Sequence, residues 1–99
     1  MTTYRLVFDD RALKEFRKLD QAVQNQARRK LAERLNNPRV QPDRLSGLKD
    51  CYKIKLRNAG VRLIYRVNDD RIEVVVISVG KRDSGKRDIY GTIVGRLKP

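Results

Sequence analysis

The sequence predicts a small α+β protein, in which a small antiparallel sheet packs against two helices and a short C-terminal helix follows. Three observations lead to this prediction. An alternating segment near the N-terminus precedes two segments with apolar residues at helical spacing. Three later segments alternate between apolar and polar residues, as strands of a half-buried sheet do. With 99 residues, 39% of them hydrophobic, the chain is expected to form one domain over residues 1–99.

The first half of the chain contains the N-terminal strand and both main helices. Residues 4–8, YRLVF, alternate in polarity and predict the strand. The aspartates at 9–10 offer a side-chain cap for a helix that follows directly. A second helix is predicted from Gln21 to Leu35, because its apolar residues recur every four positions. Residues 36–47 hold two prolines and form the main irregular connection.

The second half predicts a three-strand meander and a weak helix. The strands are expected at residues 51–57, 61–67 and 72–79. The last of them is apolar on both faces, which is typical of a central strand. A helix from about Asp88 to Leu97 is marginal because it contains two glycines. Together these elements predict a sandwich of two layers.

The strand CYKIKLR carries a cation at every second position. Because side chains alternate across a strand, its apolar half forms a core and its cations point the other way. Pairing Arg57 with Arg62 keeps the apolar residues of both hairpin strands on one face. This register collects five cations on the other face: Lys53, Lys55, Arg57, Arg62 and Arg66. Same-face neighbours lie ~7 Å apart, close to the phosphate spacing of a nucleic acid, although a solvated outer face is equally consistent.

Composition limits the possible functions. Twenty-four Lys and Arg against 12 Asp and Glu give a net charge of +12, which predicts a polyanion or an acidic protein as partner. The absence of histidine excludes Ser-His-Asp triads and His-ligated zinc. A single cysteine, no signal-peptide pattern and no long apolar run favour a cytoplasmic protein without a membrane partner.

Two motifs suggest other chemistry but lack the necessary context. GKRDSGK has the spacing of a phosphate-binding loop, yet Arg87 follows where Ser or Thr would hold magnesium. No parallel nucleotide-binding sheet follows it either. The acidic pairs at 9–10 and 69–70 are explained by a helix cap and a turn, so no metal site is expected.

Three segments resemble the RelE family of bacterial toxins: FDDRALKEFRKLD, RLSGLKDCYKIKLRNAGVRLIYRV and VVVISVGKRD. The resemblance runs from the first strand to about Asp83. It implies a RelE/ParE-like fold and a metal-independent, ribosome-dependent endoribonuclease that cuts mRNA in the ribosomal A site. It also implies a cognate acidic antitoxin (RelB-like), the 70S ribosome and mRNA as partners, and no cofactor.

The resemblance also assigns a catalytic set: Lys53, Lys55, Arg62, Arg82 and Tyr90. Arg62 would grip phosphates, Arg82 would stabilise the transition state, and one of the two lysines would help remove the 2′ proton. Tyr90 is either functional or an ordinary amphipathic residue, because its gap from Arg82 is about two residues longer than in the family. A wider set is predicted to bind RNA or the ribosome: Arg28, Arg29, Lys30, Arg57, Arg66, Lys81, Lys86 and Arg87.

Two alternatives remain at this stage. One is a gyrase inhibitor of the ParE type, which has a related fold but does not characteristically carry the full cationic set. The other is a non-catalytic RNA- or ribosome-binding module that uses the same cations. From the charge and from the resemblance, a disordered acidic antitoxin segment is expected to fold on this surface and to displace the weak C-terminal helix.

Overall fold

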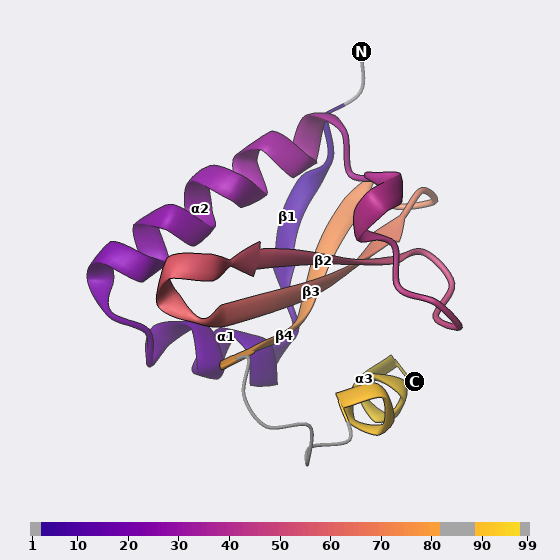
Figure 1. Cartoon of the computed structure of the whole chain (residues 1–99). Coiled ribbons are helices and arrows are strands. Elements are labelled where there is room, and N and C mark those ends of the chain that lie inside the picture. Colours follow the sequence, from indigo (N-terminus) through magenta and orange to yellow (C-terminus); the bar gives the residue numbers. More distant parts are fainter. Residues whose placement is uncertain (1–2, 82–88, 98–99) are drawn as a thin grey trace.

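The computed structural model describes residues 3–81 and 89–97, in which four strands form one sheet (Figure 1). The strands are β1 (Arg5–Phe8), β2 (Cys51–Leu56), β3 (Val61–Asn68) and β4 (Glu73–Lys81). Their order is β1-β4-β3-β2, so β4 is internal, as its apolar sequence predicts. β2, β3 and β4 are antiparallel neighbours, but β1 runs parallel to β4. The sheet is therefore mixed rather than wholly antiparallel, because the helical crossover after β1 allows parallel pairing.

The β2–β3 hairpin has the predicted faces but a different pairing. Lys55 stands opposite Arg62. The predicted pairing of Arg57 with Arg62 is wrong by two residues, a shift that keeps every side chain on its expected face. Arg57 leaves the strand and starts the 3-10 helix η2 (Arg57–Ala59). The turn closes at Gly60, whose φ of 65° lies in the left-handed region that glycine tolerates.

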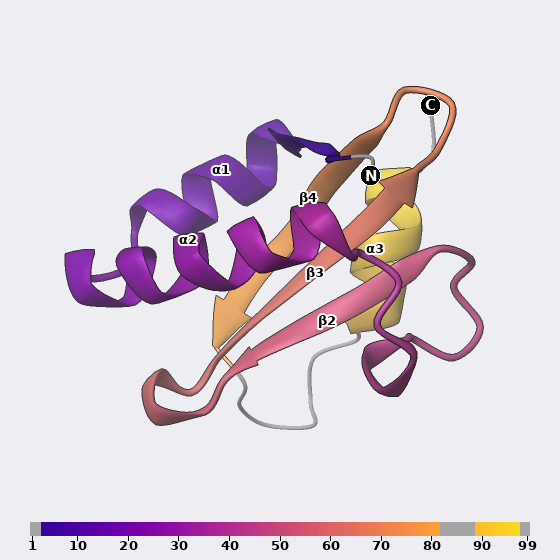
Figure 2. The same ribbon diagram turned by 90° about the horizontal axis from the view of Figure 1, so that it is seen from above.

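Two helices cover one face of the sheet (Figure 2). α1 (Asp10–Arg17) begins after Asp9, whose carboxylate accepts a hydrogen bond from the Arg11 backbone N–H at 2.9 Å, which confirms the predicted cap. α2 (Gln21–Asn36) matches its predicted range to within one residue. The main core lies between these helices and the sheet. Its buried side chains are Ala12, Phe16, Ala27, Leu31, Tyr52, Ile54, Leu56, Val61, Leu63, Tyr65, Val67, Val74, Val76 and Val79.

The C-terminal helix α3 (Ile89–Leu97) lies on the opposite face (Figures 1 and 2). Ile93 is fully buried there in a second, smaller core with Cys51, Ile64 and Ile77. The predicted two-layer arrangement is therefore wrong, because this face also carries an apolar cluster that α3 covers. Burial in this cluster raises the pKa of the Cys51 thiol to about 11, as expected of an apolar filler.

Arg96 ties α3 to both other layers. Its Nη1 and Nη2 donate to Oε1 and Oε2 of Glu15 at 2.9 and 3.0 Å, and Nη1 also donates to the Ile77 carbonyl at 2.8 Å. Glu15 in turn accepts from the Val79 backbone N–H at 3.0 Å. The side chains of Arg96 and Glu15 are only 13% and 27% exposed. Within the described ranges, no helix is long and apolar enough to cross a membrane.

Candidate active site

Two neighbouring rows across the sheet bring three of the predicted cations together. The rows, from β2 to β4, are Lys55, Arg62 and Gly80, then Lys53, Ile64 and Ser78. Residues opposed in a ladder share a face, so both rows lie on the face that carries α3. Gly80 has no side chain, and among the described residues a Cβ there would meet nothing within 4 Å. The described residues therefore leave the first row open on the β4 side of Arg62.

Arg62 has an unused hydrogen-bond donor. Its side chain is half-buried, and its Nε is buried without an acceptor among residues 3–81 and 89–97. A buried donor without an acceptor costs about 1–3 kcal/mol. The planar guanidinium of a half-buried arginine can bind two phosphate oxygens at once. Because solvent does not reach Nε in the structure, the side chain has to move before this donor can bind an anion.

The backbone beneath Lys53 is fixed by Arg34 of α2. Arg34 Nη1 donates to the Lys53 carbonyl at 3.3 Å and to the Tyr65 hydroxyl at 3.0 Å, and Nη2 donates to Asp43 at 2.6 Å. Tyr65 donates its own O–H to the Pro38 carbonyl at 2.6 Å. Burial opposes the charge of Arg34, but the bonds to Tyr65 and Asp43 outweigh it and raise its pKa.

Arg34 was not among the residues predicted from the sequence. Its position between Leu31 and Leu35 places a cation beside the apolar stripe of α2, and this was the available signal. A charged residue there must find buried partners. In the structure it links α2 to β2 and β3, and so positions the strand that carries Lys53 and Lys55.

Arg66 does not join the other cations. Ile64 stands between Arg62 and Arg66 on the same face of β3, and it is buried in the α3 cluster with Ile93. Arg66 instead borders two hollows of about 630 and 410 Å³ beside Leu97. These hollows also contain five acids: Asp9, Asp10, Asp50, Asp69 and Asp70. The five cations predicted to share one face therefore do not form a continuous group, because the apolar side chain of Ile64 lies between Arg62 and Arg66.

Other predicted residues take different positions. Arg57 is exposed in the η2 turn rather than on a strand. Lys81 is exposed and stands opposite Val61, whose side chain faces α1 and α2. It lies on this face because a β-bulge, at the register shift between Ile64 and Tyr65, changes the alternation of β4. Arg28 lies over the Phe16 ring, 5.3 Å from its centroid.

Four predicted residues have side chains outside the described part of the protein. They are Arg82, Lys86, Arg87 and Tyr90, of which only Tyr90 has a described backbone, in α3. Arg29 and Lys30 lie on the exposed side of α2 and border a groove that also contains Lys55.

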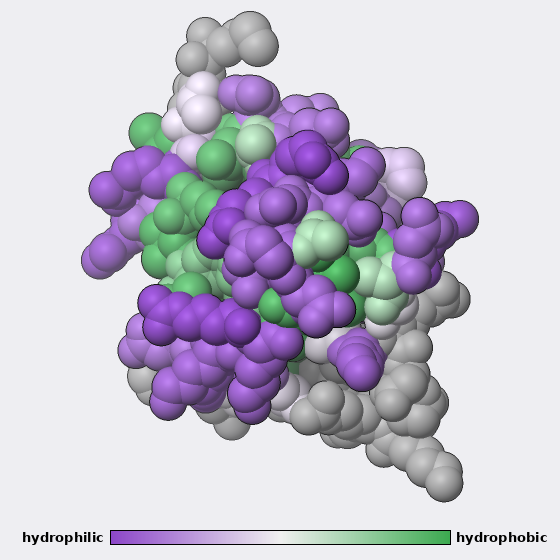
Figure 3. Space-filling view, turned by 90° about the vertical axis from the view of Figure 1, so that its left-hand side faces the viewer, coloured by the Kyte–Doolittle hydropathy of each residue, from purple (hydrophilic) through white to green (hydrophobic). Residues whose placement is uncertain are grey.

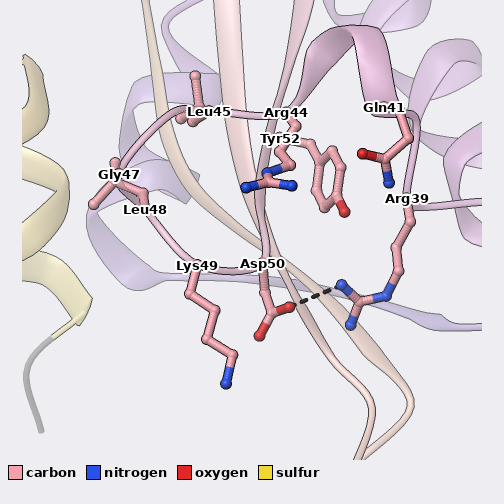
Figure 4. A pocket seen from close by; sticks show the side chains of 9 residues that line it. All are labelled: Arg39, Gln41, Arg44, Leu45, Gly47, Leu48, Lys49, Asp50 and Tyr52. Atoms are coloured by element: carbon pink, nitrogen blue, oxygen red, sulfur yellow. Dashed lines mark hydrogen bonds and ion pairs between the residues drawn. The ribbon is translucent and has the colours of Figure 1, made fainter.

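A further hollow of about 510 Å³ lies at the start of β2 (Figure 4). The Arg39 side chain points at Asp50 and bonds it at 2.8 Å, whereas Lys49 extends away from both (Figure 4). Arg39 also bonds Asp69 at 2.6 Å. Asp69 accepts a further bond from the Tyr4 hydroxyl at 2.6 Å, and this bond and the one from Arg39 lower its pKa. The charge of Arg39 is thus used within the protein.

The described residues contain no group of three or more His, Cys, Asp or Glu side chains placed to hold a metal ion. The predicted site residues that the structure places on the sheet are cations: Lys53, Lys55 and Arg62. These cations are fixed by a sheet whose opposite face is packed against two helices.

Comparisons with known proteins agree on one class. Residues 6–84 match the family model of the ParE toxin of the type II toxin–antitoxin system, parDE. The chain is 50% identical to the mRNA interferase toxin RelE of Escherichia coli over 94 residues, which cover 95% of this chain and 97% of that protein. It is also 43% identical to a putative RelE-like toxin protein of Escherichia coli, over 96% of this chain and 98% of that one.

Solved structures give the same result. A mutant of E. coli toxin RelE in the free state matches with a TM-score of 0.88 and 47% identity, over 98% of this chain and all of that one. RelE in the intact E. coli RelBE toxin–antitoxin complex matches with a TM-score of 0.79 and 53% identity, over 82% of this chain and 99% of that one.

The fold, the cationic face and these similarities define a toxin of the type II toxin–antitoxin class. The chain belongs to the RelE family of these toxins, within the wider RelE/ParE fold.

Proposed function

We propose that this protein is the toxin of a type II toxin–antitoxin pair and an endoribonuclease that cleaves mRNA in the ribosomal A site, which stops translation. The observation that carries the proposal is the row of Lys55, Arg62 and Gly80, where a buried guanidinium N–H lacks an acceptor among the described residues. The 50% identity to an mRNA interferase toxin supports the same activity. The site of action is the cytoplasm, where translation takes place.

The proposed reaction uses the RNA's own nucleophile. The ribose 2′ oxygen attacks the neighbouring phosphorus, the bond from phosphorus to the 5′ oxygen breaks, and a 2′,3′-cyclic phosphate remains. Arg62 binds the phosphate oxygens on which charge develops, which lowers the barrier most where water is excluded. Lys53 or Lys55, in its neutral amine form, receives the 2′ proton, and Arg82 stabilises the transition state and the departing 5′ oxygen, which takes its proton from water. Tyr90 orients a base or shares in proton transfer.

The ribosome supplies the alignment of the reacting groups, which the toxin's own residues do not provide. Alignment of reacting groups contributes about 7–11 kcal/mol to lowering a barrier. A toxin that offers fixed charges to an mRNA already held in a bent conformation needs no stronger base. This division of labour explains why such an enzyme would depend on the ribosome.

The partner that controls the toxin is an acidic antitoxin. A net charge of +12 favours an acidic chain. The α3 cluster has five buried residues among those described, so the contacts that a competing segment must replace are few. An antitoxin segment that folds on this face would displace α3 and move Tyr90 with it.

The test is translation in vitro followed by primer extension on the mRNA. Discrete cuts at A-site codons are expected with the purified toxin. A 2′-deoxynucleotide at the cut position should abolish cleavage while binding persists, and continued cleavage would eliminate 2′ attack.

Inhibition of DNA gyrase is a second candidate, since the matching family model is that of ParE. A gyrase supercoiling assay with the same preparation separates the two activities. Gyrase inhibition without mRNA cuts would replace the proposed function. If neither mRNA cuts nor gyrase inhibition are observed, the remaining interpretation is a non-catalytic binding protein.

A further inference from the structure

The end of β4 extends past its parallel neighbour. β1 ends at Phe8, which stands opposite Val76, whereas β4 continues to Lys81. Among the described residues, no strand borders this part of β4 on the side away from β3. Backbone groups that point to this side need other partners, because an unpaired buried N–H or C=O is costly.

A side-chain ion pair takes the place of the missing strand. The Glu15 carboxylate accepts a hydrogen bond from the Val79 N–H at 3.0 Å, and Arg96 donates to the Ile77 carbonyl at 2.8 Å. These two backbone groups flank Ser78, and one residue of a parallel strand would bond both of them. Glu15 and Arg96 also bond each other, at 2.9 and 3.0 Å. The pair therefore completes the sheet where β1 has ended.

Glu15 is not an ordinary surface carboxylate of a helix. In Figure 3 the α2 side of the molecule is mostly hydrophilic, as expected where charged side chains of a helix face solvent. The Glu15 side chain on α1 is instead 27% exposed, and one of its oxygens bonds the backbone of the sheet. Its charge is thus used to fix α1 and α3 to one position on β4.

The part of β4 that Glu15 holds lies beside the proposed active site. On the β3 side, Ser78 stands opposite Ile64 and Gly80 stands opposite Arg62. Val79 lies between these two rows. The next residue after β4 is Arg82, which the proposed reaction uses in the transition state. A shift of the end of β4 would therefore change the position of one catalytic cation relative to the other.

We propose that Glu15 is a positioning residue for RNA cleavage, whose carboxylate holds the end of β4 where the reaction requires it, beside Arg62 and directly before Arg82. The inference rests on the proposed function, because it gives Glu15 a part in that reaction. A displacement of a catalytic group by about 1 Å can cost about 100-fold in rate. RNA is bound by the cations, so Glu15 affects the rate of cleavage and not the affinity for the ribosome.

The test is single-turnover cleavage of mRNA on programmed 70S ribosomes with toxin in excess. Glu15→Ala removes the acceptor of the Val79 N–H, and should lower the rate at saturating toxin by up to about 100-fold. The half-saturating toxin concentration should stay unchanged. Glu15→Gln should restore most of the rate, because its amide oxygen can still accept this bond. Hydrogen exchange of the Val79 amide, followed by NMR, should be faster in the alanine variant only.

Comparison of the two variants separates β4 from α3. Both substitutions weaken the pair with Arg96, but only alanine removes the acceptor from Val79. A glutamine variant as slow as the alanine variant would assign the effect to α3 and overturn the proposal. A changed half-saturating concentration with an unchanged rate would overturn it too. If Glu15→Ala does not fold, Glu15→Asp replaces it, because the shorter side chain moves the carboxylate away from Val79.

Asp69→Ala is the matched control. Asp69 also accepts hydrogen bonds, from Arg39 and Tyr4 at 2.6 Å each, but it lies before the start of β4, at the other end of the strand. Its loss should destabilise the protein and leave the cleavage rate unchanged. An equal loss of rate in the Asp69 and Glu15 variants would show general destabilisation and refute the positioning role.

Wild-type toxin in the same assay tests the proposed function separately. Discrete cuts by the wild type together with an unchanged rate in Glu15→Ala refute the positioning role alone. If the wild type makes no cuts, the proposed function is refuted, and the role of Glu15 with it.

Discussion

Replacing Arg96 by methionine should loosen α3 without unfolding the rest of the protein. The methionine keeps an apolar stem but loses the two bonds to Glu15 and the bond to the Ile77 carbonyl. Hydrogen bonds to charged groups contribute about 1.5–3 kcal/mol each. The pair is partly exposed, at 13% and 27%, and Glu15 keeps its bond from the Val79 N–H. We therefore expect the net loss to be that of a single such bond, about 1.5–3 kcal/mol.

Hydrogen exchange measured by mass spectrometry reports this loss by segment. A lower opening free energy of this size makes the amides of α3 exchange roughly 10- to 150-fold faster. The amides of β3 should keep their protection, because the main core lies on the other face of the sheet. Arg17→Met, an exposed change on α1, is the matched control and should leave both segments unchanged.

Two results would refute this reasoning. Unchanged exchange of α3 in the Arg96→Met variant would show that apolar contacts, such as those of Ile93 and Leu97, hold the helix without the ion pair. Equal acceleration in α3 and β3 would show that α3 unfolds only with the whole protein. Glu15→Gln tests the charge separately: its amide oxygen can still accept the Val79 N–H, so a smaller acceleration is expected.

Three further predictions concern the site and its support. Arg62→Ala should lower the cleavage rate about 10²–10³-fold in the translation assay. Arg62→Lys should recover only part of the lost rate, and the control Arg71→Ala, at an exposed position, should leave the rate unchanged. Tyr65→Phe removes the donor to Pro38 and the acceptor for Arg34, so the free energy of unfolding should fall by about 1–3 kcal/mol in urea titrations, and no change would contradict the role of this network. The Asp69 pKa is lowered in the folded protein, so its stabilisation is present above the unfolded pKa of about 3.9 and is lost as pH falls through the folded pKa. The urea midpoints of wild type and Asp69→Asn should therefore converge between about pH 5 and pH 2, and a constant difference would contradict this.

Alternation was the most informative feature of the sequence. It predicted which side chains of β2 and β3 face the core, since a strand has only two faces and one of them is buried. The pairing itself was not predictable to better than two residues. A shift by two preserves every face, and only the geometry of the turn at Gly60 distinguishes Lys55–Arg62 from Arg57–Arg62.

The burial of Ile64 under α3, which separates Arg62 from Arg66, could not be predicted from the sequence pattern. Ile64 has the same parity as Arg62 and Arg66, and nothing local shows that Ile93 will cover it. The same limit applies to Arg96 and Glu15, which are 81 positions apart in the chain. Contacts of this range depend on how α3 docks, and a marginal helix with two glycines gives little information about that.

The division of the sheet into two unequal cores links stability to regulation. Among the described residues, 14 are buried in the core under α1 and α2, but only five in the core under α3. Most of the hydrophobic stabilisation therefore lies on the face away from the cations. Under the proposed regulation, a partner segment replaces α3 on the face with Lys55 and Arg62 while the larger core keeps the rest folded. An antitoxin segment that replaces α3 then has to overcome the Arg96–Glu15 pair and the burial of a few side chains, a small part of the free energy that holds the toxin together.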